Sequence, residues 1–137
     1  MSKNMTKRIR HLDFRNERGQ AMTEFALILP VLALLLFAII QCGIVFHNYV
    51  EITDATRAGA RKAAVSRDLP DPTAAATAAV RSSANGLDSG DLNVSVTSSF
   101  DRGSDVTVTA SYPYSISLLG VVVKSGRITS KTTERVE

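Results

Sequence analysis

The sequence predicts an α+β protein: a long N-terminal transmembrane helix that continues outside the membrane, then a small domain with a second helix and a roughly three-stranded antiparallel sheet. Three observations support this fold class. An apolar run of 22 residues occupies 25–46, a segment without proline extends from Tyr49 to Arg67, and alternating apolar and polar residues follow position 91. The run is long enough to cross a membrane as a helix, and the alternation is typical of half-buried strands.

The apolar run, Phe25 to Phe46, contains no charged residue, and only Pro30, Gln41 and Gly43 interrupt it. As a helix it spans roughly 33 Å at about 1.5 Å per residue, enough for a hydrocarbon core of about 30 Å. A cleaved secretory signal has a shorter apolar stretch, of about 7–15 residues. Gln41 is also a poor neighbour for lipoprotein processing at Cys42. We therefore expect the span to be retained.

Positive charge is concentrated before this run. Residues 1–18 carry six basic and two acidic side chains, whereas residues 19–137 carry ten basic and eleven acidic ones. Basic segments that flank a membrane span stay in the cytoplasm. We therefore predict a single-pass protein of the inner membrane, with a cytoplasmic N-terminus and an extracytoplasmic C-terminal domain. A nucleic-acid-binding tail is disfavoured, because no recognisable nucleic-acid-binding domain accompanies the basic tract.

A glycine and a carboxylate stand where the apolar run begins: Gly19 is followed five residues later by Glu24. A carboxylate in a membrane segment costs roughly 2.5–3.5 kcal/mol at mid-bilayer and less near the edge, so it usually has a partner. If the chain is cut after Gly19, the new α-amino group of Gln20 brings a positive charge close to Glu24 of a neighbouring subunit. Alternatively, Glu24 only favours the helix N-terminus through the macrodipole.

The stretch Arg18-Gly19-Gln20-Ala21-Met22-Thr23-Glu24-Phe25-Ala26-Leu27-Ile28-Leu29-Pro30 resembles the start of TadE-like pseudopilins, minor components of the tight-adherence (Tad, Flp-type) pilus machinery. The region Ile52–Val65 is similar to the helix that follows the membrane span in this family, and the β-rich end fits loosely. The resemblance implies that a prepilin peptidase cuts between Gly19 and Gln20. It also implies that Glu24 sets the register of subunits in an assembly.

Two function classes remain open at this point. The resemblance implies a minor pilin in a Tad pilus or a related secretion apparatus. Its partners would be the inner membrane, a prepilin peptidase, other pilin or pseudopilin subunits and the pilus assembly platform. The alternative is an uncleaved single-pass anchor or scaffold whose outer domain binds an envelope partner. Removal of the leader favours the first class and retention favours the second; neither involves a nucleic acid, a small-molecule substrate or a cofactor.

We expect four parts along the chain: a basic cytoplasmic leader (1–19), the transmembrane helix (20–46), its continuation outside the membrane (47–69) and a small extracytoplasmic α/β domain (70–137). On the continuation, Ala55, Gly59 and Ala63 recur every four residues and form a stripe of small side chains. Such a stripe lets another helix approach closely. It fits packing against neighbouring pilin helices and packing against the protein's own domain equally well.

The outer domain is predicted to contain a second helix and three strands. The helix runs from Pro72 to Asn85 with Asp71 as its N-cap. Two half-buried strands, 92–97 and 106–112, are joined by a turn at 101–104. A polar third strand at 126–136 is expected at an edge of the sheet.

The segment Ile116 to Lys124 lies in an apparent loop between the second and third predicted strands, and within it Leu118, Leu119 and Val121 to Val123 form an apolar cluster. An exposed apolar loop marks a contact with a partner or a membrane. The alternative is that this segment folds back over the sheet and completes the core.

No catalytic constellation is evident, so we predict that the protein is not an enzyme. Cys42 is the only cysteine and lies in the span, which excludes an intrachain disulfide. His11 and His47 lie on opposite sides of the predicted membrane, and neither has a cluster of metal-ligating residues nearby. No phosphate-binding glycine loop and no serine nucleophile motif occurs.

Overall fold

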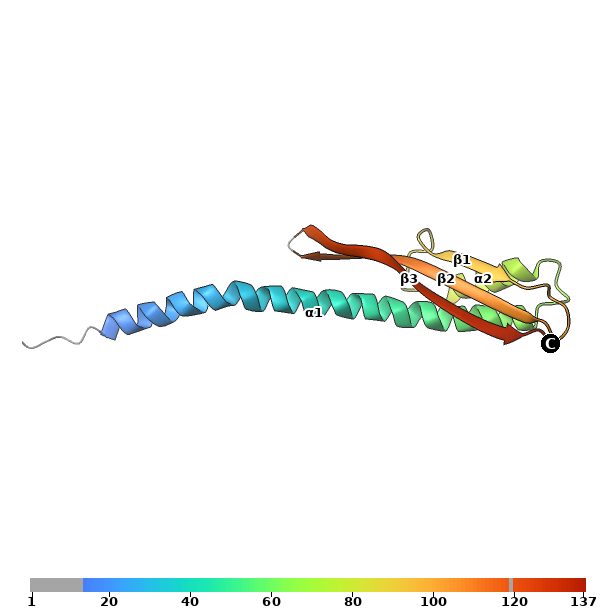
Figure 1. The fold of residues 1–137 in the computed structure, drawn as a ribbon, viewed down its shortest axis with the longest axis horizontal. Helices are drawn as coiled ribbons and strands as arrows, with labels where there is room; N and C mark the ends of the chain where they lie inside the picture. The colour runs from blue at the N-terminus through green and yellow to red at the C-terminus, as the bar shows by residue number, and fades with distance from the viewer. Residues whose placement is uncertain (1–13, 119) are drawn as a thin grey trace, which may run out of the picture. The chain divides into compact units, whose positions relative to one another are not determined.

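The computed structural model describes residues 14–118 and 120–137, with side-chain exposure from residue 19 onward. Its elements are the helices α1 (Phe14–Ala64) and α2 (Pro72–Ser83) and the strands β1 (Asn93–Thr97), β2 (Asp105–Leu118) and β3 (Val121–Arg135) (Figure 1). The three strands form one antiparallel sheet in the order β1-β2-β3. The predicted fold class is therefore confirmed. Most of the basic leader, residues 1–13, lies outside the described residues.

Helix α1 is longer at its start and shorter at its end than predicted. It begins at Phe14 rather than Gln20, continues through Pro30 and ends at Ala64, three residues before Arg67. The early end has a local cause at Ser66. Its hydroxyl donates a hydrogen bond to the Lys62 carbonyl, and its backbone N–H donates to the Ala63 carbonyl (3.1 Å). These bonds satisfy carbonyls of the last turn that another helical turn would otherwise use.

Helix α2 begins where the sequence predicts. The Asp71 side chain accepts a hydrogen bond from the Ala74 backbone N–H (2.8 Å), and Pro72 occupies the first helical turn, where a missing N–H costs nothing. The helix ends at Ser83, two residues before the predicted Asn85. Its buried side chains, Ala76 and Val80, face the core.

The sheet follows the predicted alternation over its inner part. β1 pairs with β2 so that Val94 lies opposite Ala110, and β3 lies at an edge, as expected. The connecting turn at 101–104 is closed by a hydrogen bond from the Ser104 N–H to the Asp101 carbonyl (2.9 Å). Gly103 adopts a φ of +80°, which a residue with a side chain rarely takes.

The expectation of a loop at 116–124 is wrong. β2 and β3 continue as one long hairpin until Leu118 pairs with Val121, and Gly120 provides the positive φ (+84°) of the tight turn. Folding back over the sheet is also wrong, because Val121, Val122 and Val123 are 67%, 60% and 63% exposed. Consecutive β-branched residues favour extended backbone even where alternation is lost, which explains the longer strands.

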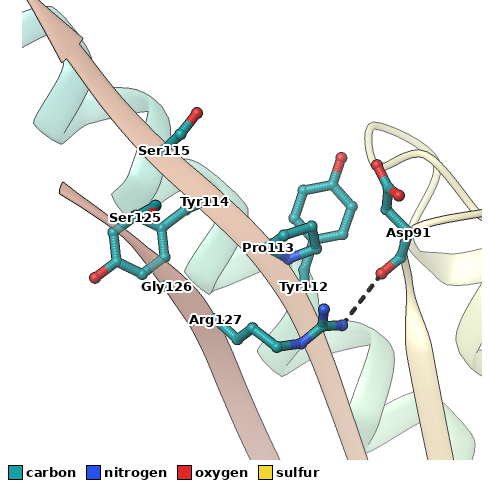
Figure 2. Close-up of a pocket in the computed structure, with 8 residues that line it drawn as sticks. All are labelled: Asp91, Tyr112, Pro113, Tyr114, Ser115, Ser125, Gly126 and Arg127. Carbon is teal, nitrogen blue, oxygen red and sulfur yellow. Dashed lines mark hydrogen bonds between the residues drawn. The ribbon is translucent and has the colours of Figure 1, made fainter. Parts of the chain in front are cut away.

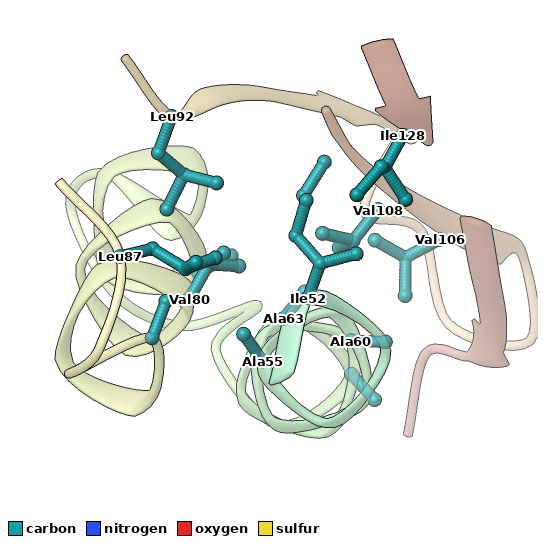
Figure 3. Packing of buried hydrophobic residues seen from close by; sticks show 14 of the residues in the cluster. Ile52, Ala55, Ala60, Ala63, Val80, Leu87, Leu92, Val106, Val108 and Ile128 are labelled. Carbon is teal, nitrogen blue, oxygen red and sulfur yellow. The ribbon is translucent and has the colours of Figure 1, made fainter. Parts of the chain in front are cut away.

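The core lies between α1, α2 and one face of the sheet (Figure 3). α1 contributes small residues and Ile52, α2 contributes Val80, and β2 contributes Val106 and Val108, all of which are fully buried. Gly59 permits the close approach of these elements. A Cβ atom at Gly59 would collide with a methyl group of Val80 and lie 3.4 Å from Val108 Cγ1.

We predict that Gly59→Ala destabilises the outer domain. The added methyl group must displace the buried Val80 side chain, and overpacking of this kind costs about 1–3 kcal/mol. The better helix propensity of alanine offsets up to about 1 kcal/mol of that cost. Thermal unfolding of the full chain in detergent micelles, followed by circular dichroism, should show a lower midpoint.

The matched control is Gly43→Ala. Gly43 lies in the same helix, and a Cβ atom there would meet nothing within 4 Å. This variant should unfold at or above the midpoint of the unmodified chain. Equal midpoints for the two variants would contradict the close packing at Gly59.

Two polar contacts fasten α1 to the outer domain. The Glu51 carboxylate accepts a hydrogen bond from the Gly86 backbone N–H, just beyond α2, and only 16% of its side chain is exposed. At the other end of this region, the Glu137 N–H donates to the Ala64 carbonyl (3.1 Å). His47 adds to the first contact, with its Nε2 atom 3.6 Å from Glu51 Oε2. The domain is therefore tied to α1 at both ends of the shared core.

We predict that Glu51→Ala lowers the free energy of unfolding by about 1–3 kcal/mol, because it leaves the Gly86 N–H without its acceptor. Glu51→Gln keeps a side-chain carbonyl of the same reach and should lose clearly less. Chemical denaturation of both variants in the same micelles measures the difference. If the two variants lost equal stability, the charge rather than the hydrogen bond would hold this junction.

Candidate functional site

The candidate site is the segment Gly19 to Glu24, which opens the apolar part of α1. The peptide bond between Gly19 and Gln20 lies inside the helix, because α1 starts at Phe14. Gly19 is exposed, and a Cβ atom there would meet nothing within 4 Å. The bond is therefore open on its outer side. It also lies within two turns of the helix start, where helices fray most easily.

Glu24 lies one helical turn after Gln20, and both side chains are exposed. The Gln20 Nε2 atom donates a hydrogen bond to Glu24 Oε1 (3.1 Å). Beside this pair, the Thr23 hydroxyl donates to the Gly19 carbonyl (2.9 Å). The carboxylate is thus oriented toward the Gln20 end of the helix by a neutral amide, and no rearrangement of the backbone is needed to bring it there.

The helix after Glu24 is apolar on all sides. Leu27, Ile28 and Leu29 point in three directions about 100° apart, and their exposed fractions are 72%, 54% and 51%. By length and composition, the stretch that begins at Gly19 is able to cross a membrane, and none of its most apolar window is buried within the chain. A surface of this kind requires lipid or other helices around it.

The stripe of small side chains is used within the chain. Ala55, Gly59 and Ala63 are buried where α1 packs on α2 and β2. Of the two kinds of packing that fitted the sequence, the structure contains the one with the protein's own domain. Asp54 and Arg57 form an ion pair along the helix (3.3 Å), and both are exposed.

The sequence reasoning missed an open groove of about 550 Å³ on the hairpin (Figure 2). Arg127 Nη2 lies in it and donates to the carbonyls of Asp91 (3.4 Å) and Ser111 (3.3 Å), so this cation holds the segment just before β1 against the hairpin. The Tyr114 ring covers Gly126, where a Cβ atom would lie 3.0 Å from the ring. Local sequence does not reveal this groove, because its residues meet only through strand pairing.

The described residues, 14–118 and 120–137, contain no group of histidine, cysteine and acidic side chains suited to a metal ion. Cys42 is exposed on α1. In the groove, the Arg127 guanidinium is engaged with backbone carbonyls, and most of the walls are residues of β2 and β3. The arrangement is therefore that of a structural contact.

Comparison with known proteins supports the importance of the N-terminal segment. The family described as TadE-like protein matches residues 19–61, a stretch that begins at Gly19 and ends within the part of α1 that packs on the outer domain. No curated protein and no solved structure matches the chain. The match confirms the resemblance indicated by residues 18–30: from Gly19 to Arg61, this chain is similar to the TadE-like proteins.

Proposed function

We propose that the chain is a minor pilin or pseudopilin that takes part in the assembly of a Tad pilus or a related secretion apparatus. In this proposal it is made as a single-pass protein of the inner membrane, with residues 1–19 in the cytoplasm and the outer domain on the other side. A prepilin peptidase removes the leader between Gly19 and Gln20. The mature subunit then packs through its N-terminal helix against other pilin subunits and the assembly platform, as a structural component rather than an enzyme.

One observation carries this proposal: a carboxylate lies at the start of an apolar helix whose side chains are mostly exposed. Glu24 is the last charged residue before Phe25 to Phe46. The apolar side chains that follow are exposed around the helix. A permanent anchor has the same need for lipid, but it has no need for a charge at this depth, which is costly in a bilayer. The family match over residues 19–61 favours the same role.

Processing requires access to the Gly19–Gln20 bond. A peptidase acts on extended backbone, so the first turns of α1 must unwind before cleavage. Glycine lowers the cost of this unwinding, because only proline is less favourable than glycine in a helix interior. The absence of a side chain at Gly19 also leaves the bond open to a catalytic centre. The helix start at Phe14 is therefore compatible with cleavage five residues further on.

Assembly then uses the charge that cleavage creates. The α-amino group of Gln20 is positive near neutral pH, and it lies one turn from Glu24 of its own chain. In a helical array, staggered subunits can place this amine beside the Glu24 carboxylate of a neighbour. Among apolar helices, such an ion pair is the one directional contact available. It fixes how far one helix slides along the next.

We predict that Gly19→Leu blocks removal of the leader, because the side chain fills the space beside the scissile bond and strengthens the helix around it. Intact-mass measurement of protein purified from its native membrane should then show a chain that keeps residues 1–19. The unmodified chain should begin at Gln20.

Gly43→Leu is the matched control, since it makes the same change in the same helix at a second open position. It should be processed normally. Retention of residues 1–19 by the unmodified chain, in cells with an active prepilin peptidase, would rule out the pilin role and leave the permanent anchor.

We predict that Glu24→Gln is processed normally but assembles poorly. The amide still accepts the Gln20 hydrogen bond, yet it cannot neutralise a neighbour's α-amino group. Breaking one side of a buried ion pair costs about 3–5 kcal/mol, so recovery of the subunit with pilin partners should fall at least about tenfold. The measurement is quantitative immunoblotting of crosslinked, affinity-purified complexes.

Thr23→Val serves as the control for Glu24→Gln. It changes an exposed neighbour on the same turn without removing a charge, and it should assemble like the unmodified chain. Equal recovery of Glu24→Gln and Thr23→Val would show that the carboxylate does not set subunit register.

A further inference from the structure

The end of the β2–β3 hairpin is an apolar surface, which we call the hairpin tip: the half-buried Ile116 and Leu118 and the exposed Val121, Val122 and Val123. The three valines are among the most exposed large apolar side chains of the outer domain. A soluble domain rarely keeps such a cluster in water without a contact that covers it. The position of the tip along α1 indicates what covers it.

The hairpin extends back along α1 from the helix's C-terminal end. β3 ends beside Ala64, where the Glu137 N–H bonds the Ala64 carbonyl (3.1 Å), and Val136 is buried. From there β3 covers 15 residues, or about 50 Å at 3.3 Å per residue. The same distance along a helix corresponds to roughly 30 residues. Even with divergence of the two axes, the tip therefore comes level with the outer half of the apolar run, residues 37–46.

Exposure along α1 agrees with this position. Ala38, Gln41, Val45 and Asn48 are half-buried, while most of their neighbours are exposed. Their spacing of three and four residues places them on one helix face, which continues into the buried Ile52. Val45 packs against the core together with the hairpin tyrosines. In Figure 1 the hairpin runs alongside α1 toward the middle of the helix.

We propose that the hairpin tip inserts into the outer leaflet of the same bilayer that α1 crosses. The inference rests on the membrane anchoring in the proposed function. If residues 25–46 lie in a membrane, the lipid that surrounds 37–46 also surrounds the side chains level with them. The tip and this part of α1 then form one continuous apolar surface within a single compact unit, Phe37–Glu137.

The residues that follow the tip have the order expected at a membrane surface. Lys124 pairs across the hairpin with Ile116, directly above the valines. Next come Tyr114 and then Tyr112. Lysine extends its charged end toward lipid phosphates while its stem remains among apolar groups, and tyrosine is enriched at the interface between lipid and water.

Backbone hydrogen bonding limits the depth of insertion. β1 covers β2 only as far as Ser111, so the hairpin beyond it is a two-stranded ribbon with two open edges. Unpaired N–H and C=O groups are not tolerated in the hydrocarbon core. The tip therefore lies no deeper than the outer end of residues 37–46, near the boundary between headgroups and acyl chains, where water and phosphates reach the edges. Gln41, the polar residue on the facing side of α1, is half-buried near this level.

The test uses tryptophan as a depth probe, because the chain contains none. Three full-length variants are reconstituted into phosphatidylethanolamine–phosphatidylglycerol vesicles with brominated acyl chains, which quench tryptophan on contact. Val122→Trp reports on the tip. Phe37→Trp reports on the span itself, and Arg102→Trp reports on the turn at the far end of the sheet. Circular dichroism verifies that each variant is folded.

We expect Val122→Trp to be quenched, with an emission loss nearer to that of Phe37→Trp than to the small loss of Arg102→Trp. Quenching of Phe37→Trp alone would overturn the insertion and leave membrane anchoring intact. A blue-shifted but unquenched Val122→Trp would also overturn it, because a second copy of the chain rather than lipid would then cover the tip. If Phe37→Trp were not quenched either, the proposal would fall together with the anchoring on which it rests.

Discussion

The outer domain depends on the close approach of α1 to α2 and β2 at Gly59. A sheet of three strands and a helix of twelve residues bury too little apolar surface to be stable alone. The missing third layer is the end of α1, and only small side chains on that face allow Val80 and Val108 to reach it. The helix is therefore part of the domain's core as well as its stalk. Glu51 and the chain terminus at Glu137 hold the same helix at the two ends of this contact.

This packing divides α1 into two surfaces with different tasks. From Ile52 to Ala64 one face is committed to the domain, and small residues serve there because backbone elements must come close. From Phe25 to Phe46 most side chains are apolar and exposed, which suits lipid or neighbouring helices. A stripe of small residues has the same appearance in both situations, so its sequence does not identify its partner. The decisive information is the distance to Val80 and Val108, residues far away in the chain.

Features with a local physical cause could be predicted from the sequence. Asp71 and Pro72 specify the start of α2 through a cap and a missing donor, and Val106 and Val108 specify a buried strand face through their spacing. Gly19 and Glu24 stay a prediction, made because a carboxylate at the start of an apolar span usually has a partner. The hairpin beyond Tyr112 could not be predicted, because its residues do not alternate and its length depends on cross-strand pairing. The groove at Arg127 depends on the same pairing with the start of β1.

If the chain is a pilin subunit that leaves the membrane, as we propose, the hairpin also constrains its exit. Residues 37–64 of α1 and the hairpin belong to one compact unit, so in this proposal the tip leaves the lipid together with the outer half of the apolar helix. Extraction of α1 alone would require only partner helices that replace the lipid around the apolar helix. Extraction of α1 together with the tip requires partners that also cover Val121 to Val123, on the side of α1 where the hairpin lies. A binding site that covers both the apolar helix and the hairpin tip accepts the subunit in few orientations. In the proposed assembly, the β-ribbon therefore adds a rotational restriction to the axial register that we propose for the Glu24 carboxylate.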